Sequence, residues 1–205
     1  MAYITVQNIR DEGVSDSQYT DGHIKDRIAL AQETIELLTG RFFEPRSDQT
    51  FKFDGTGHDL LWLTIPPITV DAISSVTIDD IEVDSDDYEF FIRLGSDWRF
   101  NPKLRMFYGT WPKGNSNIEI SGDFGFVESD GENTPPLIKD LCKRIAIWGI
   151  GLRGDADTGR SQQIIEESLG DYRYRLSEAA KTGLFGDPTI DNLIDTYKIK
   201  HMGTL

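Results

Sequence analysis

The glycine spacing of residues 149–154 is the part of the sequence closest to a nucleotide-binding motif. Gly149, Gly151 and Gly154 match G-x-G-x-x-G, and Asp171 follows at about the separation of a ribose-binding acid. That chemistry needs a strand before the glycines and a helix N-terminus after them, so that backbone amides can hold a pyrophosphate. The residues before Gly149 have helical spacing instead, and those after Gly154 are acidic and loop-like. The pattern therefore indicates glycine-rich helix termination.

Residues 109–114 carry two glycines at the spacing of a phosphate-binding loop. Asn115 stands at the next position, where that motif needs a lysine to reach the phosphates. Proline and glycine between strand-like segments favour a turn. We therefore expect residues 109–114 to connect two strands.

Seven carboxylates fall within eleven residues of the middle of the chain, namely Asp79, Asp80, Glu82, Asp84, Asp86, Asp87 and Glu89. Calcium is held by several oxygen ligands, so the cluster suggests a calcium site. The EF-hand pattern fails because its sixth loop position lacks glycine, and alternation with Ile81 and Val83 predicts strand, loop and strand. A glycosidase-type carboxylate pair carries little information, because any two of the 35 acidic residues can be chosen. We expect a solvated acidic loop.

The other reactive side chains show no catalytic or metal-binding arrangement. His23, His58 and His201 lack ligand spacing, and the chain has no G-x-S-x-G motif for an acyl-transfer nucleophile. Cys142 falls on the apolar side of a predicted helix, where a small buried hydrophobic residue is expected. As the single cysteine, it excludes an intrachain disulfide and a cysteine-based metal centre. The sequence predicts neither an enzyme nor a cofactor.

The charge balance is acidic, with 35 acidic and 21 basic residues and a net charge of -14. Residues 51–130 carry 15 acidic and 6 basic residues, and so hold -9 of that charge. Surface carboxylates repel phosphate, so tight binding to DNA or RNA is disfavoured.

The N-terminus lacks a secretory signal pattern, and no apolar run approaches the roughly 18 residues of a membrane span. The single cysteine, Cys142, fits synthesis in a reducing cytoplasm.

Hydrophobic periodicity predicts an α+β fold with a helical core. Apolar residues recur at spacings of three and four in three segments, which predicts helices near 21–40, 137–152 and 188–199. Apolar and polar residues alternate in short runs, which predicts a central antiparallel β-rich insertion over about 51–126. The expected organisation is an N-terminal helical part of the core (1–50), an acidic β-rich module (51–130), and a second helical part with an extended C-terminal segment (131–205).

Local signals set the expected boundaries of these elements. N-caps are expected at Asp21, Thr134 and Asp187, and a helix stop at Gly40. Residues 164–169 suggest a short helical piece, after which tyrosine and arginine alternate over 172–175.

The C-terminal part of the chain carries a recognisable order of features. The run Glu167-Ser-Leu-Gly-Asp-Tyr172 is followed by a Gly- and Pro-punctuated stretch at 183–188 and by a helix ending at Tyr197. In this order they resemble the head-tail adaptor family of tailed bacteriophages, also called head completion or connector proteins. Further agreeing segments are 37–43, 63–70, 75–78, 87–88, 111–114, 117–122 and Pro136 at the start of the long helix. The resemblance covers most of the chain.

The resemblance implies a structural protein of the virion, made in the bacterial host cytoplasm. Such proteins form a ring, typically of twelve copies, that docks on the portal protein. The ring extends the DNA channel, with transient and non-specific proximity to the genome, and bridges to the next neck protein, a stopper or tail terminator. No membrane is involved.

Two sets of residues become candidate contact sites under this resemblance. Aromatic and apolar side chains of the C-terminal segment are hypothesised to anchor the chain to the portal: Tyr172, Tyr174, Leu193, Ile194 and Tyr197. The spacing of Leu193 and Ile194 fits packing on the protein's own helices equally well. Acidic residues 79–89 are hypothesised to line the lumen, and helices 21–40 and 137–152 to form the wall between subunits.

Two other classes of function stay open. A calcium- or carbohydrate-binding β module would use the acidic loop for calcium and Trp62, Trp98 or Trp111 to stack on sugars. A calcium- or glycan-dependent change in stability would reveal it. A nucleotide-dependent enzyme would rest on Gly149–Gly154, and a cofactor-induced rise in melting temperature would identify it.

Overall fold

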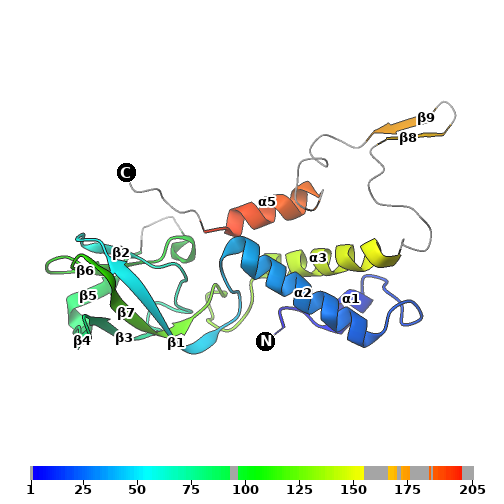
Figure 1. Cartoon of the computed structure of the whole chain (residues 1–205). Coiled ribbons are helices and arrows are strands. Elements are labelled where there is room, and N and C mark those ends of the chain that lie inside the picture. The colour runs from blue at the N-terminus through cyan, green and yellow to red at the C-terminus, as the bar shows by residue number, and fades with distance from the viewer. Residues whose placement is uncertain are drawn as a thin grey trace. The chain divides into compact units, whose positions relative to one another are not determined.

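The computed structural model describes residues 2–92, 97–154, 166–169, 172–175, 185 and 187–199. These residues form helices and antiparallel sheets, which confirms the predicted α+β class (Figure 1). The chain divides into two compact units. We call Met1–Gly40 with Pro136–Lys198 the helical unit, and Arg41–Pro135 the β unit.

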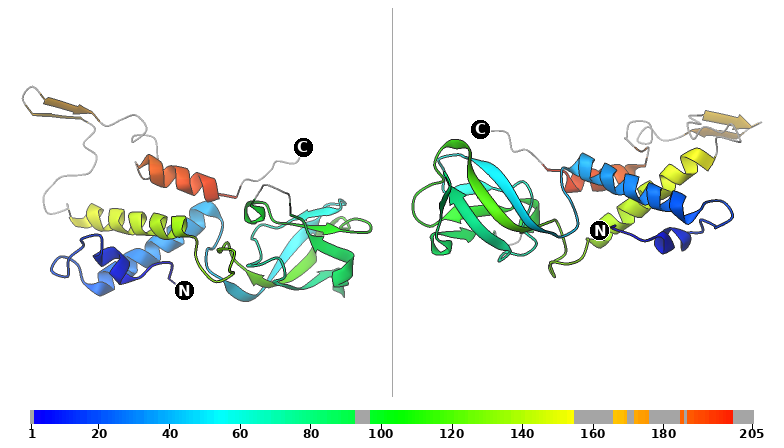
Figure 2. Two further views of the ribbon diagram at one scale, coloured as in Figure 1. Left: turned by 180° about the vertical axis from the view of Figure 1, so that it is seen from behind. Right: turned by 60° about the horizontal axis from the view of Figure 1, so that its bottom comes forward.

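The described residues of the helical unit form the helices α1 (Val6–Arg10), α2 (Asp21–Thr39), α3 (Pro136–Gly154) and α5 (Pro188–Tyr197). Helix α2 packs against α3, and α5 packs against both (Figure 2). The buried residues of α2 are Ile24, Ile28, Ala31, Ile35 and Thr39, at the predicted spacing of three and four. Because one face of each helix is apolar, burying these faces together holds the unit.

The helix boundaries agree with the sequence predictions except at two N-termini. Gly40 ends α2 with φ 71, and the Asp187 carboxylate accepts a hydrogen bond from the Thr189 amide at 2.8 Å. The N-cap of α2 is Thr20 and not Asp21, because the Thr20 hydroxyl accepts from the His23 amide at 3.3 Å. Asp21 is instead in the first turn, where its charge favours the helix dipole.

Thr134 is not a helix cap, contrary to the sequence prediction. Helix α3 begins at Pro136, two residues later. The Thr134 hydroxyl donates to the Phe43 carbonyl at 2.7 Å, a contact between segments of the β unit that are 91 residues apart. The hydroxyl thus donates to a distant carbonyl, whereas a capping hydroxyl would accept from an amide in the first turn of the helix.

The segment predicted as a short helix is a strand where the structure describes it. Strands β8 (Glu166–Leu169) and β9 (Tyr172–Arg175) pair antiparallel, with Leu169 opposite Tyr172. Positions 164 and 165 lie outside the described residues. The helical prediction was wrong because it overlooked the Gly-Asp dipeptide at 170–171, a two-residue connection typical of hairpins.

The β unit contains two antiparallel sheets. The first has the order β1 (Arg46–Gly55), β7 (Gly114–Phe124), β3 (Ile73–Ile78) and β4 (Ile81–Glu82). The second has the order β2 (Leu60–Trp62), β6 (Lys103–Met106) and β5 (Tyr88–Phe90). Two short 3-10 helices, η1 (Ser85–Asp87) and η2 (Trp98–Phe100), lie in the connections. The predicted alternation of the strands is confirmed, with Phe51 opposite Ile120 and Phe53 opposite Ile118.

The core of the β unit is lined by residues from both sheets and from the connections between strands. Its buried members are Phe42, Leu61, Leu63, Val76, Leu104, Trp111, Ile118, Ile120 and Phe124. Trp111 is fully buried, and its indole Nε1 donates to the Asp59 carbonyl at 3.0 Å. This bond satisfies the polar atom of a side chain that otherwise contributes a large apolar surface.

The β3–β4 turn predicts a stabilising substitution. Asp79 and Asp80 form a two-residue connection with φ of 49 and 64, the backbone of a type I′ turn. Asn-Gly suits this backbone better than two aspartates, so Asp79→Asn/Asp80→Gly should raise the free energy of unfolding by about 1 kcal/mol. Thermal unfolding followed by circular dichroism should show a rise of roughly 2–4 °C.

A matched control separates turn geometry from charge. Asp86→Asn/Asp87→Asn also removes two negative charges from the acidic stretch, but neither Asp86 nor Asp87 has a positive φ. If the control gave the same stabilisation, charge relief and not backbone strain would be the cause.

Candidate functional site

The acidic residues singled out in the sequence lie on one continuous stretch of the β unit. We call Asp79, Asp80, Glu82, Asp84, Asp86 and Asp87 the acidic edge, and all six are exposed. They occupy the β3–β4 turn, strand β4 and helix η1. The seventh, Glu89, is half-buried in β5 and pairs with Arg105 of β6. The sequence has no lysine or arginine between Lys52 and Arg93. Six exposed carboxylates therefore have no basic residue close to them in sequence.

Local contacts within the acidic edge organise the backbone. The Asp84 carboxylate accepts from the Asp86 amide at 3.0 Å and so caps η1. Burial raises the pKa of Tyr88, and the negative charges of Glu82 and Asp84 raise it further. In the described part of the chain, no three His, Cys, Asp or Glu side chains are grouped so that they could hold a metal ion. The described residues thus give the calcium alternative no ligand set.

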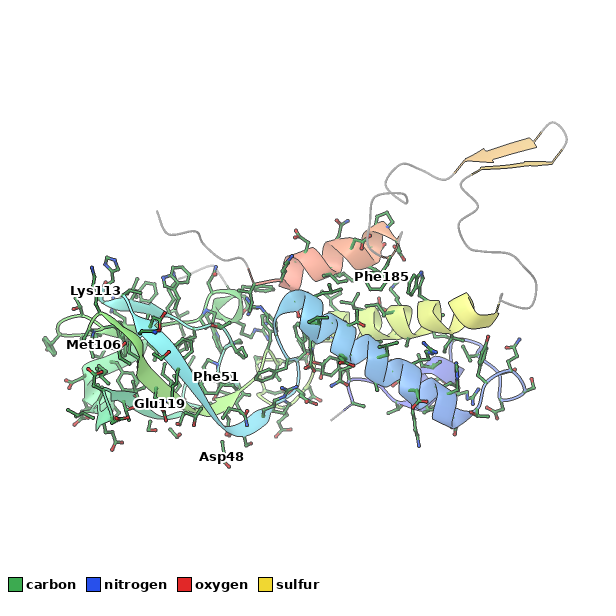
Figure 3. The ribbon with its side chains drawn as sticks, viewed as in Figure 1. Asp48, Phe51, Met106, Lys113, Glu119 and Phe185 are labelled. Atoms are coloured by element: carbon green, nitrogen blue, oxygen red, sulfur yellow. The ribbon has the colours of Figure 1, made fainter. Side chains whose placement is uncertain are left out.

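An exposed aromatic loop adjoins the acidic edge. We call residues 107–110, which follow β6, the aromatic loop; Phe107 is 47% exposed and Tyr108 is 84% exposed. The Phe107 amide donates to the Asp87 carbonyl at 2.9 Å, which joins the loop to the end of η1. Figure 3 labels Met106 and Lys113, which bracket this part of the chain. Nothing in the periodicity of the sequence indicated these two aromatic residues.

The glycines of residues 109–114 form the predicted turn. Gly109 has a φ of 90, in the left-handed region that favours glycine, and Gly114 begins β7. Asn115 lies in β7.

The tryptophans proposed as sugar-stacking platforms have other contacts. Trp111 is buried in the core. The Lys103 ammonium lies 3.6 Å from the centroid of the Trp62 ring, and Trp98 packs edge-on against Phe90 with centroids 4.9 Å apart. A sugar would have to displace the lysine from Trp62, which weighs against a carbohydrate site there.

The helical unit exposes leucines on the side of its helices that is not in the core. Leu30 and Leu37 of α2 are 51% and 81% exposed, and Leu137 of α3 is 54% exposed. Leu30 and Leu37 are seven residues apart, two turns along one face of α2. The sequence predicted that this helix belongs both to the core and to the wall between subunits, but its periodicity did not separate this second apolar face from the first.

The predicted portal anchors fall into two groups. Ile194 and Tyr197 are buried in the helical unit, where α5 packs on α2 and α3, and Leu193 is half-buried. This burial supports packing on the protein's own helices, the alternative that the spacing left open. Tyr172 and Tyr174 lie in β9, and their side chains are outside the described residues. Their role as anchors stays a prediction.

The enzyme-like motifs occur in a helical context. Gly149–Gly154 forms the last residues of α3, so a helix and not a strand precedes the glycines. Cys142 is fully buried as predicted, and burial raises the pKa of its thiol to about 12. A reactive thiol needs exposure and a lowered pKa. Among the described helices, none has the length and hydropathy to cross a bilayer.

Comparison with known proteins shows a shared fold. No protein-family model and no curated protein matches the sequence. A chain of the neck of an empty gene transfer agent particle, computed with C6 symmetry, matches with a TM-score of 0.56 and 14% identity, covering 98% of this chain and 93% of that one. A chain of the virion of a native gene transfer agent particle matches with a TM-score of 0.55 and 15% identity, with coverage of 98% and 93%. The likeness therefore spans both units.

The burial of Cys142 predicts an unreactive thiol. With a pKa near 12, the thiolate fraction at pH 8 is about a thousandfold below that of an ordinary cysteine, and the side chain is inaccessible as well. Ellman's reagent should label the native protein only as fast as it unfolds, and should label it stoichiometrically in denaturant. Because there is one cysteine, the signal has a single source. Rapid labelling of the native protein would contradict the burial.

Proposed function

We propose that this chain is a structural head-tail adaptor, a neck protein of a tailed-phage-like particle located in the virion. The observation that carries the proposal is the fold shared over 98% of the chain with a chain from the neck of a gene transfer agent particle. The order of sequence features that resembles head-tail adaptors supports the same assignment independently. The chain would act by assembly and not by catalysis.

Self-association into a ring is the first step of the proposed function. The exposed face of α2, with Leu30 and Leu37, would be covered by a neighbouring copy, and Leu137 would add to the same wall. Burying a leucine side chain contributes about 1.5–3 kcal/mol, so each such contact in the wall would favour association of neighbouring copies. A head-to-tail interface of this kind closes into a ring when its rotation permits. The similar neck was computed with C6 symmetry, which supports a cyclic assembly.

Docking on the portal is assigned to the C-terminal segment. Residues 131–205 would supply the docking segment, with Tyr172 and Tyr174 as its anchors. Aromatic side chains are favoured as anchors because they bury a large area at low entropic cost. The burial of Ile194 and Tyr197 gives α5 a second role, since it also closes the core of the helical unit.

The acidic balance suits a channel through which DNA passes. A net charge of -14 offers phosphate few counterion-releasing contacts, so the genome would slide without being held. The ring would extend the channel and bridge to the next neck protein.

A double substitution on α2 tests the ring. Leu30→Glu/Leu37→Glu should reduce binding to heads made without this chain by at least about tenfold, because two charges would be buried without partners in the subunit wall. Cryo-electron microscopy of the reconstituted heads measures ring occupancy. Ile92→Glu, at a similarly exposed site of the β unit, is the control and should leave occupancy unchanged. Full occupancy with the double variant would exclude this wall.

A substitution in the hairpin tests portal docking. Tyr172→Ser/Tyr174→Ser should leave the fold intact and lower attachment to portal-bearing heads by roughly tenfold or more, since hot-spot aromatics dominate interfaces. The measurement is co-sedimentation of the purified protein with heads. Tyr108→Ser makes the same chemical change at an exposed site outside the C-terminal segment and should attach normally. Normal attachment of the hairpin variant would refute the assignment.

A further inference from the structure

The aromatic loop and the acidic edge form one surface of the β unit. The backbone hydrogen bond from Phe107 to Asp87 brings the aromatic residues to the end of η1. Tyr88, which follows η1, has its pKa raised in part by the charges of Glu82 and Asp84, so these carboxylates also lie close by. Ile81, within the acidic edge, is 73% exposed. Large apolar side chains and uncompensated carboxylates thus share this surface.

The aromatic loop is held at both ends before any partner arrives. Phe107 is fixed to Asp87 at one end. At the other end Trp111 is buried, its amide donates to His58 at 2.9 Å, and its carbonyl accepts from Gly57 at 2.8 Å. A loop fixed in this way loses little conformational entropy on binding. The exposure of Tyr108 is therefore built into the fold.

The exposed aromatics indicate a protein contact. Tyrosine is enriched among the residues that dominate binding energy at protein interfaces. DNA offers the surface little, because its bases are stacked inside the duplex and its phosphates repel carboxylates. An 84% exposed tyrosine beside a 47% exposed phenylalanine suits packing in a protein interface.

Charge disfavours a second copy of this chain as the occupant. The chain is itself strongly acidic. Seven of its described lysines and arginines already pair with carboxylates of their own chain, namely Arg10, Arg46, Lys52, Arg99, Arg105, Lys143 and Arg144. A neighbouring copy carries 35 acidic and 21 basic residues, so its surface would on balance repel six exposed carboxylates. The complementary surface belongs to a different protein.

We infer that the aromatic loop and the acidic edge together dock the next neck component, through a pocket for Tyr108 that is rimmed by lysine or arginine. The inference rests on the proposed function and replaces the hypothesis that the acidic edge lines the lumen. The C-terminal segment, with Arg173 and Arg175, differs in charge from this surface, so the two would suit different partners. One surface would face the portal and the other the component that follows.

Two sets of variants test the inference on heads made without this chain. Phe107→Ser/Tyr108→Ser should occupy heads as a ring like the wild type but lower tail joining by roughly thirtyfold. Ile92→Ser, exposed elsewhere in the β unit, should join tails normally. Tail joining by the wild type should weaken as salt rises, and Asp84→Asn/Asp86→Asn/Asp87→Asn should reduce both joining and its salt dependence. Asparagine at 84 retains the ability to cap η1.

Photocrosslinking identifies what the surface touches. With benzoylphenylalanine in place of Tyr108, the expected product in assembled particles is a crosslink to a different protein, at a peptide flanked by lysine or arginine. A crosslink to DNA, to a second copy of the chain, or to an acidic peptide would overturn the inference, as would normal tail joining by Phe107→Ser/Tyr108→Ser. None of these results affects ring occupancy. If the wild type itself failed to occupy heads, the proposed function would fall instead.

Discussion

Burial of Trp111 is the constraint on which the β unit depends. Its indole fills the core between the two sheets, and its backbone and ring bond to residues 57–59, which lie between β1 and β2. The tryptophan thus ties together the connections that precede β2 and β7. The same burial fixes the position of the aromatic loop that immediately precedes it. Stability of the core and presentation of Tyr108 therefore have one physical cause.

The helical unit differs from the β unit because its helices carry apolar residues on two faces, one buried and one exposed. The first face of α2 is satisfied within the chain by α3 and α5. The second, with Leu30 and Leu37, has no cover among the described residues that would remove it from water. Exposed apolar side chains in register along a helix are typical of surfaces that another protein covers. The two units thus present surfaces of different chemistry, apolar on the helices and acidic with aromatics on the sheets.

Periodicity was sufficient to predict helices α2, α3 and α5 and strands β1, β2, β3 and β7, because burial of one face imposes a period on the sequence. The alternation of Phe51 and Phe53 and the spacing from Ile24 to Ile35 are direct records of that burial. Contacts between residues far apart in the sequence produce no periodic pattern. The hydrogen bond from the Thr134 hydroxyl to the Phe43 carbonyl was therefore not predicted. The same limit applies to the candidate surface. The acidic edge could be predicted because its carboxylates are clustered in the sequence. The exposure of Tyr108 could not, because it depends on the backbone contacts of Trp111, three residues later in the chain.

The first sheet of the β unit ends at β4, a strand of two residues that carries Glu82 and is flanked by aspartates. Edge strands have unpaired amides and carbonyls, and identical sheets held close together tend to join through them. The negative charges around this short strand repel the same strand of another copy. A strand of two residues also offers too few backbone hydrogen bonds to hold two sheets together. If many copies assemble around one axis as proposed, this edge would keep each subunit separate and so limit aggregation during assembly.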